Sequence, residues 1–419
     1  MTQAQALKIL KQGYNAYLTG PAGSGKTFLL NQFIHYLKGW QVVTGVTAST
    51  GIAATHLGGI TIHSWAGFGI KDAASDGELK ELTRRRHLRH RLLGAEVLVI
   101  DEVSMLHGRQ LDLVDRIARL VRDDDRPFGG LQVILSGDFF QLPPVSGKGE
   151  EEASGVYDSQ AWKELNLRVC YLDEQHRQED QGFLNLLKEI RGNMVSLRSW
   201  DLLKERLGAD LKSRVEPVKL YTHNFAVDEY NQKRLDEIDK RPQFYEMRAH
   251  GKKHLTEALA RGCLAPQLLG LKIGAAVMFV KNNFEAGYVN GTTGKIVDFD
   301  EDNWPLVELE DERLLTVTPV AWALEDEGVI QAQITQLPLR LAWAVTVHKS
   351  QGMSLEAAEM DLSRAFVPGM GYVALSRVRA LSGLKLLGLN EMALKVDQRA
   401  VELDKELRAL SAAAERALE

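Results

Sequence analysis

Near its start the chain reads Gly20-Pro21-Ala22-Gly23-Ser24-Gly25-Lys26-Thr27, which fits the phosphate-binding pattern G-x-x-x-x-G-K-[ST] without a gap. A short apolar run at 16–18 precedes the pattern, and helix-spaced apolar residues follow it from Phe28 to Leu37. A glycine-rich turn without a ligand is the alternative. Because the spacing and the strand-to-helix context are both correct, the stretch predicts a nucleotide-binding loop.

Each part of this loop has a physical task. Glycines let backbone N–H groups close around phosphate oxygens, and the following helix directs its positive dipole end at them. Lys26 is expected to contact the β- and γ-phosphates, and the Thr27 hydroxyl to ligate Mg²⁺. The expected cofactors are therefore ATP and Mg²⁺, and the expected nucleotide-binding residues of the loop are Gly20, Ala22, Gly23, Ser24, Gly25, Lys26 and Thr27.

Length and composition indicate a soluble globular protein with more than one domain. The chain has 419 residues, of which 45% are hydrophobic and 26% charged. It contains no apolar run near the roughly 20 residues that span a bilayer, and no secretory core at its start. We therefore expect a cytoplasmic protein with no membrane partner. The two cysteines, Cys170 and Cys263, lack metal-type spacing and predict buried thiols.

Charge patterning leaves two interpretations open. The net charge of −5 does not indicate a nucleic-acid binder. Residues 84–91, however, read Arg-Arg-Arg-His-Leu-Arg-His-Arg. On this cluster alone, a solvated basic helix face and a nucleic-acid contact are equally good explanations.

Strand-like runs alternate with helical ones through about residue 170, which predicts a parallel sheet with helices on both faces. Ligands of such sheets lie at the carboxyl ends of the strands. Asp101 and Glu102 follow the apolar run 97–100, where Asp101 would hold Mg²⁺ and Glu102 would orient or deprotonate the attacking water. Gln141, after the next strand, is a candidate γ-phosphate sensor, with a Gly-Asp turn as the alternative.

Two segments rich in hydroxyl groups and glycine, 47–51 and 59–65, suit contacts with a nucleic-acid strand. Their small donors fit phosphates, and Trp65 fits base stacking. Helix caps and a core tryptophan are the alternative, and they would be preferred if the segments stood alone.

A second strand-and-helix series begins at 218–221 and continues through 342–347 to 371–377. It has no phosphate loop of its own, so an isolated arginine in it suggests an arginine finger for the γ-phosphate. Arg177 and Arg377 are the candidates, and a structural pair with a carboxylate is the alternative for each. Between these segments, short strands and the hairpin signal Asn290-Gly291 predict a small antiparallel barrel over about 270–335. The tail from about Glu391 predicts a helix.

The ordered set of motifs resembles superfamily-one DNA helicases of the PIF (petite integration frequency) type, which are related to RecD. The stretch from Ser104-Met105-Leu106 through 127–130 into 137–145 is the most specific part, because it resembles the segment that separates this family from RecD and Rep-like helicases. The match covers nearly the whole chain. Its motifs are, in order, Gly20 to Thr27, Thr47 to Ala53, Asp101 to Met105, Gly137 to Val145, Val347 to Ser354 and Tyr372 to Val378.

The resemblance implies an α/β fold with two RecA-like parallel-sheet lobes, a small helical wedge insertion and an SH3-like β-barrel insertion. The first ATPase lobe would span 1–170, with the wedge at 66–95. The second lobe would comprise 171–265 and 336–395, with the barrel at 266–335, and a C-terminal helix would occupy 396–419.

The resemblance also implies roles for single residues. Gln3 lies where the adenine-reading glutamine is expected, and Gln5 competes for this role. Where many family members have phenylalanine before the arginine of the fourth motif, this chain has His176. The implied catalytic residues are Lys26, Asp101, Glu102, Gln141, Arg177 and Arg377, with Thr27 and Asp101 at the metal. The implied DNA contacts are Thr50, His63, Ser64, Arg84, Arg85, Arg86, His348 and Lys349.

The function so implied is that of an ATP-dependent DNA helicase that moves 5′ to 3′ on single-stranded DNA, with tailed or forked DNA as its partner. We expect a monomer associated with the nucleoid, in the context of DNA repair and recombination. A translocase that remodels protein–DNA complexes without unwinding duplexes would use the same motifs. A phosphate-loop ATPase that acts on proteins or small molecules is weakened by the motifs of the second lobe.

Overall fold

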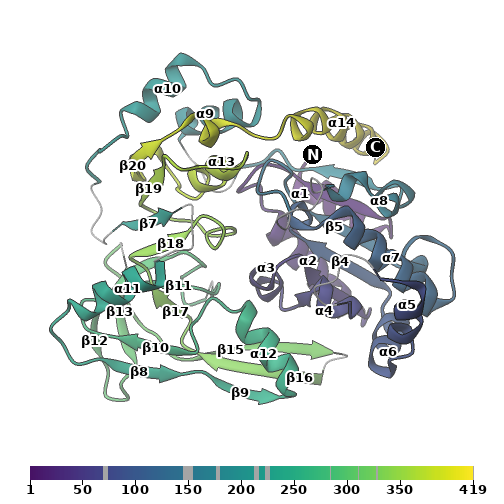
Figure 1. Cartoon of the computed structure of the whole chain (residues 1–419), viewed down its shortest axis with the longest axis horizontal. Helices are drawn as coiled ribbons and strands as arrows, with labels where there is room; N and C mark the ends of the chain where they lie inside the picture. The colour runs from purple at the N-terminus through teal and green to yellow at the C-terminus, as the bar shows by residue number, and fades with distance from the viewer. Residues whose placement is uncertain are drawn as a thin grey trace. The chain divides into compact units, whose positions relative to one another are not determined.

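The computed structural model divides the chain into two compact units (Figure 1). The first comprises Met1–His176, Glu325–Val329 and Glu402–Glu419, and the second Arg177–Leu324 and Ile330–Val401. The residues that the structure describes are 1–68, 74–144, 154–175, 180–211, 217–221, 227–283, 285–309, 311–326 and 329–418.

The first unit is built on a six-stranded sheet in which every neighbouring pair is parallel. Side chains alternate across it: Ala16 and Leu18 enter one core cluster, and Tyr17 between them enters another. The sheet is therefore buried on both faces, as the alternation of strands and helices predicted. Its strand order is β3 (Ile60–Thr61), β2 (Thr44–Ala48), β4 (Val97–Asp101), β5 (Gln132–Ser136), β1 (Ala16–Thr19) and β6 (Arg168–Tyr171).

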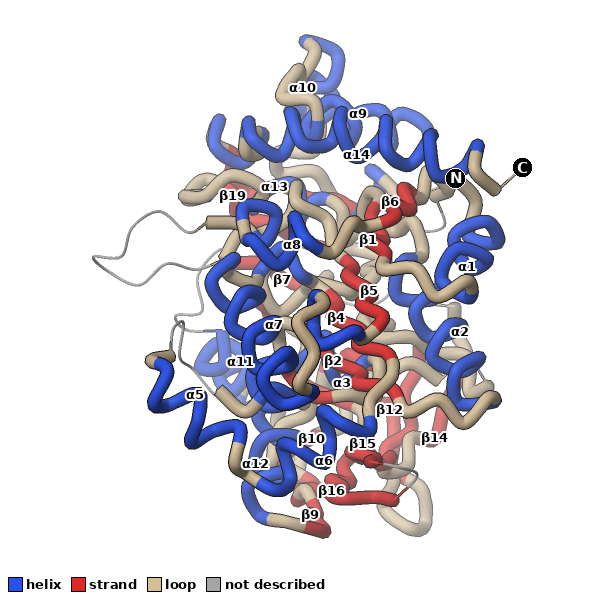
Figure 2. The backbone as a smooth tube through the Cα atoms, turned by 90° about the vertical axis from the view of Figure 1, so that its right-hand side faces the viewer, coloured by secondary structure: helices blue, strands red, loops and turns tan. Residues whose placement is uncertain are grey.

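Helices cover both faces of this sheet (Figure 2). One core cluster joins the sheet to α1 (Gln3–Lys11) and α2 (Lys26–Gly39). The other joins it to a larger group on the opposite face, made of α4 (Ile62–Ala66), α5 (Asp76–Thr83), α6 (Arg86–Gly94), α7 (Gly108–Arg122) and α8 (Gln160–Glu164). The short α3 (Gly51–His56) follows β2.

The second unit has a parallel sheet of its own, with the order β18 (Ala344–Thr346), β7 (Val218–Tyr221), β19 (Ala358–Leu362) and β20 (Leu384–Leu389). Asn231 ties a helix to its edge, because the side chain donates to the Ala344 carbonyl at 2.9 Å and accepts from the Ala344 N–H at 2.8 Å. The predicted second series is thus present. Its helices are α9 (Gln181–Arg191), α10 (Leu197–Lys204), α11 (Val227–Asp236) and α13 (Met370–Leu375).

The short strands expected between 266 and 335 divide among three sheets. β11 (Ala276–Phe279) and β12 (Thr293–Phe299) pair antiparallel on either side of Asn290-Gly291, and β13 (Pro305–Leu309), β14 (Leu314–Thr316) and β17 (Leu339–Leu341) complete their sheet. In contrast, β15 (Val320–Asp326) and β16 (Val329–Gln336) lie in a sheet with β9 (Arg248–Gly251). β8 (Gln243–Glu246) and β10 (Leu268–Leu271) form a two-stranded antiparallel sheet. In the chain, α12 (Lys253–Gly262) lies between β9 and β10.

The end of the chain returns to the first unit. A single turn at Glu391–Leu394 forms under the cap of the Asn390 side chain, and α14 begins only at Gln398 and runs to Arg416. The expected helix is therefore present but starts later than about Glu391. Residues Glu402–Glu419 belong to the first unit. Among the described helices, none is both long and apolar enough to cross a membrane.

Candidate nucleotide and DNA sites

The phosphate loop joins β1 to α2 and depends on its glycines. Gly25 caps α2 with a φ of 84°, a conformation in which glycine carries no penalty. Gly20 has a φ of 146°, and a Cβ built on it would lie 2.4 Å from the Leu172 carbonyl oxygen and 2.8 Å from Ser24 Oγ. Only glycine therefore fits at position 20 without displacing backbone.

Polar groups in the loop are arranged for an anion. Lys26 Nζ donates to the carbonyl oxygens of Gly20 at 2.8 Å and Pro21 at 3.1 Å, so the ammonium lies over the loop. The Ser24 hydroxyl is fully buried and has no hydrogen-bond partner among the described residues. Because buried polar groups are almost always paired, this orphan hydroxyl fits a ligand that supplies oxygens.

Asp101 ends β4 and is 4% exposed. Burial raises the pKa of its carboxyl, while the nearby hydroxyl of Ser136, the Glu102 amide, the charge of Lys26 and the hydroxyl of Thr27 act in the opposite direction. The structure thus brings Lys26, Thr27 and Asp101 together. The hydroxyl and carboxylate oxygens of Thr27 and Asp101 are the hard donors that suit Mg²⁺.

Glu102 sits in an unusual backbone conformation beside this group. Its φ is 54°, which is uncommon for a residue other than glycine and is typical of functional sites. Ser49 Oγ donates to the Glu102 carbonyl at 2.7 Å, and the Ser49 N–H donates to the Asp101 carbonyl at 3.0 Å. The acidic pair is therefore connected directly to the 47–51 segment.

The two glutamines assigned to the nucleotide site lie near the loop and its neighbouring strand end. Gln141 is 7% exposed, and its amide donates to Asp138 at 3.4 Å. Gln3 donates to the Ser24 carbonyl at 3.4 Å. Gln5, the competing candidate, accepts hydrogen bonds from Thr2 in a capping box instead. The geometry therefore favours Gln3 as the residue that faces the loop.

The segments expected to contact a DNA strand contain helix caps. Thr50 caps α3 by accepting from the Ala53 N–H, and Ser64 is exposed on the first turns of α4. His63 is partly exposed and its ring packs against Phe68 with 5.2 Å between centroids. Thr50, His63 and Ser64 thus keep accessible surface on two short helices.

Of the two interpretations of Trp65, base stacking and a core tryptophan, the structure supports the core tryptophan. Trp65 is 3% exposed and belongs to the core of the first unit. Its indole lies where a Cβ on Gly45 would come within 2.8 Å, so the tryptophan packs closely over β2. A side chain in this position presents no ring face to a base.

The basic cluster forms an exposed surface in the first unit. Arg84, Arg85 and Arg86 are exposed at the junction of α5 and α6. Arg91 of α6 donates to the carbonyls of Ser64 at 3.1 Å and Trp65 at 2.8 Å. The basic helix is therefore fastened to the C-terminal end of α4.

In the second unit, Arg377 is 1% exposed and lies beside the segment that carries His348 and Lys349. Its guanidinium donates to the Val373 carbonyl at 2.8 Å, the Ser350 carbonyl at 3.4 Å and the Ser376 hydroxyl at 2.7 Å. His348 and Lys349 are partly exposed, and burial lowers the pKa of His348. Arg177, the other finger candidate, and His176 lie outside the described residues.

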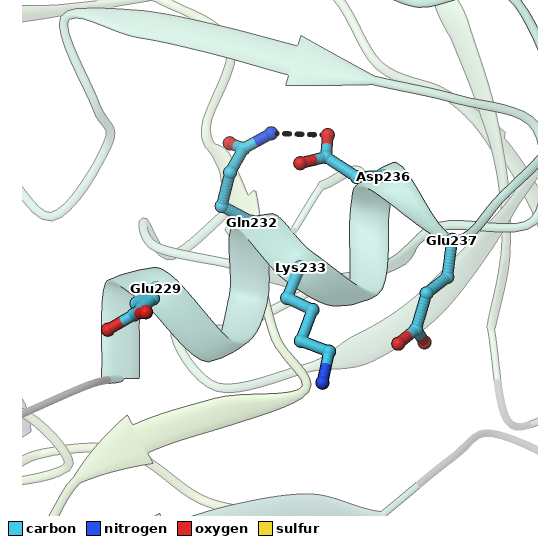
Figure 3. Close-up of a pocket in the computed structure, with 5 residues that line it drawn as sticks. All are labelled: Glu229, Gln232, Lys233, Asp236 and Glu237. Carbon is cyan, nitrogen blue, oxygen red and sulfur yellow. Dashed lines mark hydrogen bonds between the residues drawn. The ribbon is translucent and has the colours of Figure 1, made fainter.

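A shallow hollow of about 540 Å³ in the second unit is lined by residues of α11 and by Glu237, which directly follows the helix (Figure 3). Gln232 donates to Asp236 at 2.9 Å along its edge. Three carboxylates and one ammonium give it an acidic character that repels phosphate, so we assign it no nucleotide role. Its lining residues are Glu229, Gln232, Lys233, Asp236 and Glu237.

Three residues of the nucleotide site were not singled out as site residues from the sequence. Ser136 lies beside Asp101, Ser49 binds the backbone of the acidic pair, and Leu172 closes the space beside Gly20. Ser136 ends one predicted buried strand and Ser49 follows another. This position at the end of a strand is the sequence signal that could have identified them as site residues. Leu172 acts through its backbone, which no side-chain pattern reveals.

Comparisons with known proteins give one consistent result. The family described as "PIF1-like helicase" matches residues 2–198, and the family described as "DNA helicase Pif1, 2B domain" matches 254–299. A relative from Psychrobacter sp. (strain PRwf-1), named "ATP-dependent DNA helicase Pif1", is 43% identical over all of this chain and 72% of its own length. The human "ATP-dependent DNA helicase PIF1" is 37% identical over 97% of this chain and 63% of its own length.

Solved structures agree with these matches. Bacteroides sp. Pif1 in complex with ADP-AlF4 has a TM-score of 0.85 and 29% identity, and covers 97% of this chain and 96% of that chain. Bacteroides Pif1 bound to single-stranded DNA has a TM-score of 0.63 and 30% identity over the same shares of the two chains.

Proposed function

The chain belongs to the PIF1-like helicase family, and we propose that it is an ATP-dependent DNA helicase that translocates 5′ to 3′ on single-stranded DNA. The observation that carries the proposal is the meeting of Lys26, Thr27 and Asp101 at the phosphate loop of a parallel sheet. This group is the chemical core of nucleotide hydrolysis in phosphate-loop enzymes.

Nucleotide binding follows from the geometry of the loop. Backbone N–H groups of the loop and the start of α2 would hold the phosphates, and Lys26 would exchange its carbonyl contacts for the β- and γ-phosphates. The Gln3 amide, which already faces the loop at Ser24, would recognise adenine. Thr27 and Asp101 would hold Mg²⁺, which supplies charge neutralisation at the phosphates.

Hydrolysis requires a positioned water and a cation at the γ-phosphate. We assign Glu102 to orient or deprotonate the water, with Gln141 sensing the γ-phosphate. Arg177 and Arg377 are proposed as the finger arginines. To contact the γ-phosphate, Arg377 would have to release the carbonyl oxygens of Val373 and Ser350 that its guanidinium now binds.

We propose that DNA is held by two sets of residues, one on each unit. Thr50, His63 and Ser64 act with the first unit, and His348 and Lys349 with the second. The exposed arginines 84–86 and the helices around them would serve as the wedge at 66–95 that separates strands, while the β11–β14 region would supply the SH3-like barrel.

We propose that the functional unit is a monomer that acts on tailed or forked DNA near the nucleoid. One solved relative is described as two coordinating helicases at forked double-stranded DNA, so the number of copies at a fork is a separate question for this chain. A translocase that displaces proteins without unwinding is the alternative. Such a translocase would hydrolyse ATP in response to DNA but would separate no duplex.

ATP hydrolysis with and without single-stranded DNA tests the proposal. We expect the wild-type protein to be stimulated by DNA and to need Mg²⁺. Lys26→Ala should abolish hydrolysis while leaving the thermal unfolding curve in place. Normal hydrolysis by that variant would disprove the site, and a lack of stimulation by any nucleic acid would favour an ATPase with another substrate.

A further inference from the structure

One side of the phosphate loop rests on a short piece of chain that we call the wall segment, residues 171–173. The Leu172 N–H donates to the Thr19 carbonyl at 2.8 Å, just before the loop begins. The Leu172 carbonyl oxygen then fills the space beside Gly20, 2.4 Å from where a Cβ would be. The shape of the loop at its first glycine therefore depends on where the wall segment lies.

The wall segment is held on its other side by α14 (Gln398–Arg416), which lies far later in the chain. Ser411 Oγ accepts from the Tyr171 N–H at 3.0 Å. The Tyr171 hydroxyl donates to Asp404 at 2.7 Å, and Leu407 packs in the same core cluster as the tyrosine ring. Helix α14 thus contacts both the backbone and the side chain of the residue that precedes Leu172.

Arg408 of α14 joins the two ends of the wall segment. It donates to the Tyr171 hydroxyl at 2.6 Å, to Asp404 at 2.7 Å and to Asp173 at 3.2 Å. Its guanidinium also stacks over the Tyr171 ring, 4.0 Å from the centroid. A planar cation with five donors can make all four contacts at once, which a lysine ammonium cannot.

We propose that Arg408 and Asp404 are positioning residues for nucleotide binding: by fixing the wall segment against Gly20, α14 sets the affinity of the phosphate loop for ATP. The inference rests on the proposed function of that loop. The α14 helix is therefore a component of the ATPase site, although none of its residues reaches the phosphates.

Different residues of α14 dock the helix on the core and contact the wall segment. Docking of α14 needs its apolar face, which Leu407 and Ala414 provide in two core clusters. In contrast, Asp404 contacts the Tyr171 hydroxyl, and Arg408 contacts both that hydroxyl and Asp173. Removing Arg408, whose side chain is half exposed, should leave the helix docked but the wall segment looser.

Arg408→Gln is the test variant, and Lys405→Gln on an exposed position of the same helix is its matched control. Binding of a fluorescent ADP, measured by anisotropy, should weaken about three- to tenfold in Arg408→Gln and stay unchanged in the control, as expected for loss of a partly exposed charge-assisted network. In steady-state hydrolysis, KM for ATP should rise by a similar factor, while kcat falls less than about twofold because no reacting group has been removed.

Two further variants separate positioning from stability. Tyr171→Phe removes the shared hydroxyl but keeps the buried ring, and it should weaken nucleotide binding as Arg408→Gln does, with little added effect in the double variant. Arg408→Lys retains the positive charge toward Asp173 and Asp404, so its nucleotide affinity should lie between wild type and Arg408→Gln.

Several outcomes would overturn the inference. Equal nucleotide affinity in wild type and Arg408→Gln would show that α14 does not set the loop. A loss of affinity that simply follows a large fall in melting temperature would indicate a structural role only. If wild-type protein bound no nucleotide at all, the proposed function itself would fail, so the two failures are distinguishable.

Discussion

Gly20→Ala provides a quantitative test of the phosphate loop. The backbone φ of 146° at this position favours glycine, and forcing an alanine into such a conformation costs about 1–3 kcal/mol. The added methyl would also lie 2.4 Å from the Leu172 oxygen, whereas ordinary contacts are 3.4–4 Å, so that carbonyl must move by about 1 Å. In the Gly20→Ala variant, the phosphate loop and the wall segment therefore cannot both keep their positions.

The strain is relieved only if the loop leaves its phosphate-binding shape. At about 1.4 kcal/mol for each factor of ten, a strain of about 1–3 kcal/mol predicts an affinity for ATP that is roughly 5- to 140-fold weaker. Titration with fluorescent ADP, together with a urea unfolding curve, measures the two effects separately.

Gly39→Ala is the matched control. Gly39 lies at the end of α2, and a Cβ there meets nothing within 4 Å. Alanine in a helix is more stable than glycine by about 0.5–1 kcal/mol, so this variant should bind nucleotide normally and unfold at slightly higher urea. If Gly20→Ala bound nucleotide like wild type, the assignment of the loop shape would be refuted.

Three further predictions concern the metal, the wedge and the second unit. Chelation of divalent cations should abolish ATP hydrolysis, and Mg²⁺ should restore it; hydrolysis that persists in excess chelator would exclude a metal at Thr27. Reversing the charge of Arg84, Arg85 and Arg86 together should reduce duplex unwinding more than DNA-stimulated hydrolysis, and equal losses would argue against a wedge. Gly371→Ala places a methyl 1.9 Å from the Ala393 carbonyl and should destabilise the second unit by about 1–3 kcal/mol in urea unfolding, whereas an unchanged midpoint would contradict this packing.

The position of the proposed nucleotide site in the fold was predictable because its signals are local. A glycine pattern between a strand and a helix, and an acidic pair at the end of the next buried strand, specify their own positions in a parallel sheet. The structure accordingly brings Lys26, Thr27 and Asp101 together. The sequence also predicted the parallel sheets of both units, because buried strands alternate with helices in each.

Sheet membership in the inserted region was not predictable in the same way. Alternating short strands indicate antiparallel pairing, but they do not say which sheet a strand joins. Thus β16 pairs with β9, about 80 residues earlier, and β15 pairs with β16, rather than either strand joining β11–β14. Trp65 illustrates a related ambiguity, since an aromatic residue beside small polar ones suits both a DNA-binding surface and a core.

Contacts between residues far apart in the sequence could not be predicted from the spacing of motifs. The network between Tyr171 and Arg408 joins positions 237 residues apart, and no local pattern in α14 distinguishes Arg408 from other basic residues. The contribution of Leu172 to the phosphate loop is likewise a backbone contact. The role of Arg177 remains a prediction from its motif.

The most direct test of the central claim is ATP-dependent strand separation on two matched DNA duplexes, one with a 5′ single-stranded tail and one with a 3′ tail. We expect separation of the 5′-tailed duplex alone by the wild-type protein, and none by Lys26→Ala on either duplex. Separation of only the 3′-tailed duplex would contradict the proposed direction, and the absence of separation from both, with DNA-stimulated hydrolysis intact, would favour a translocase that does not unwind.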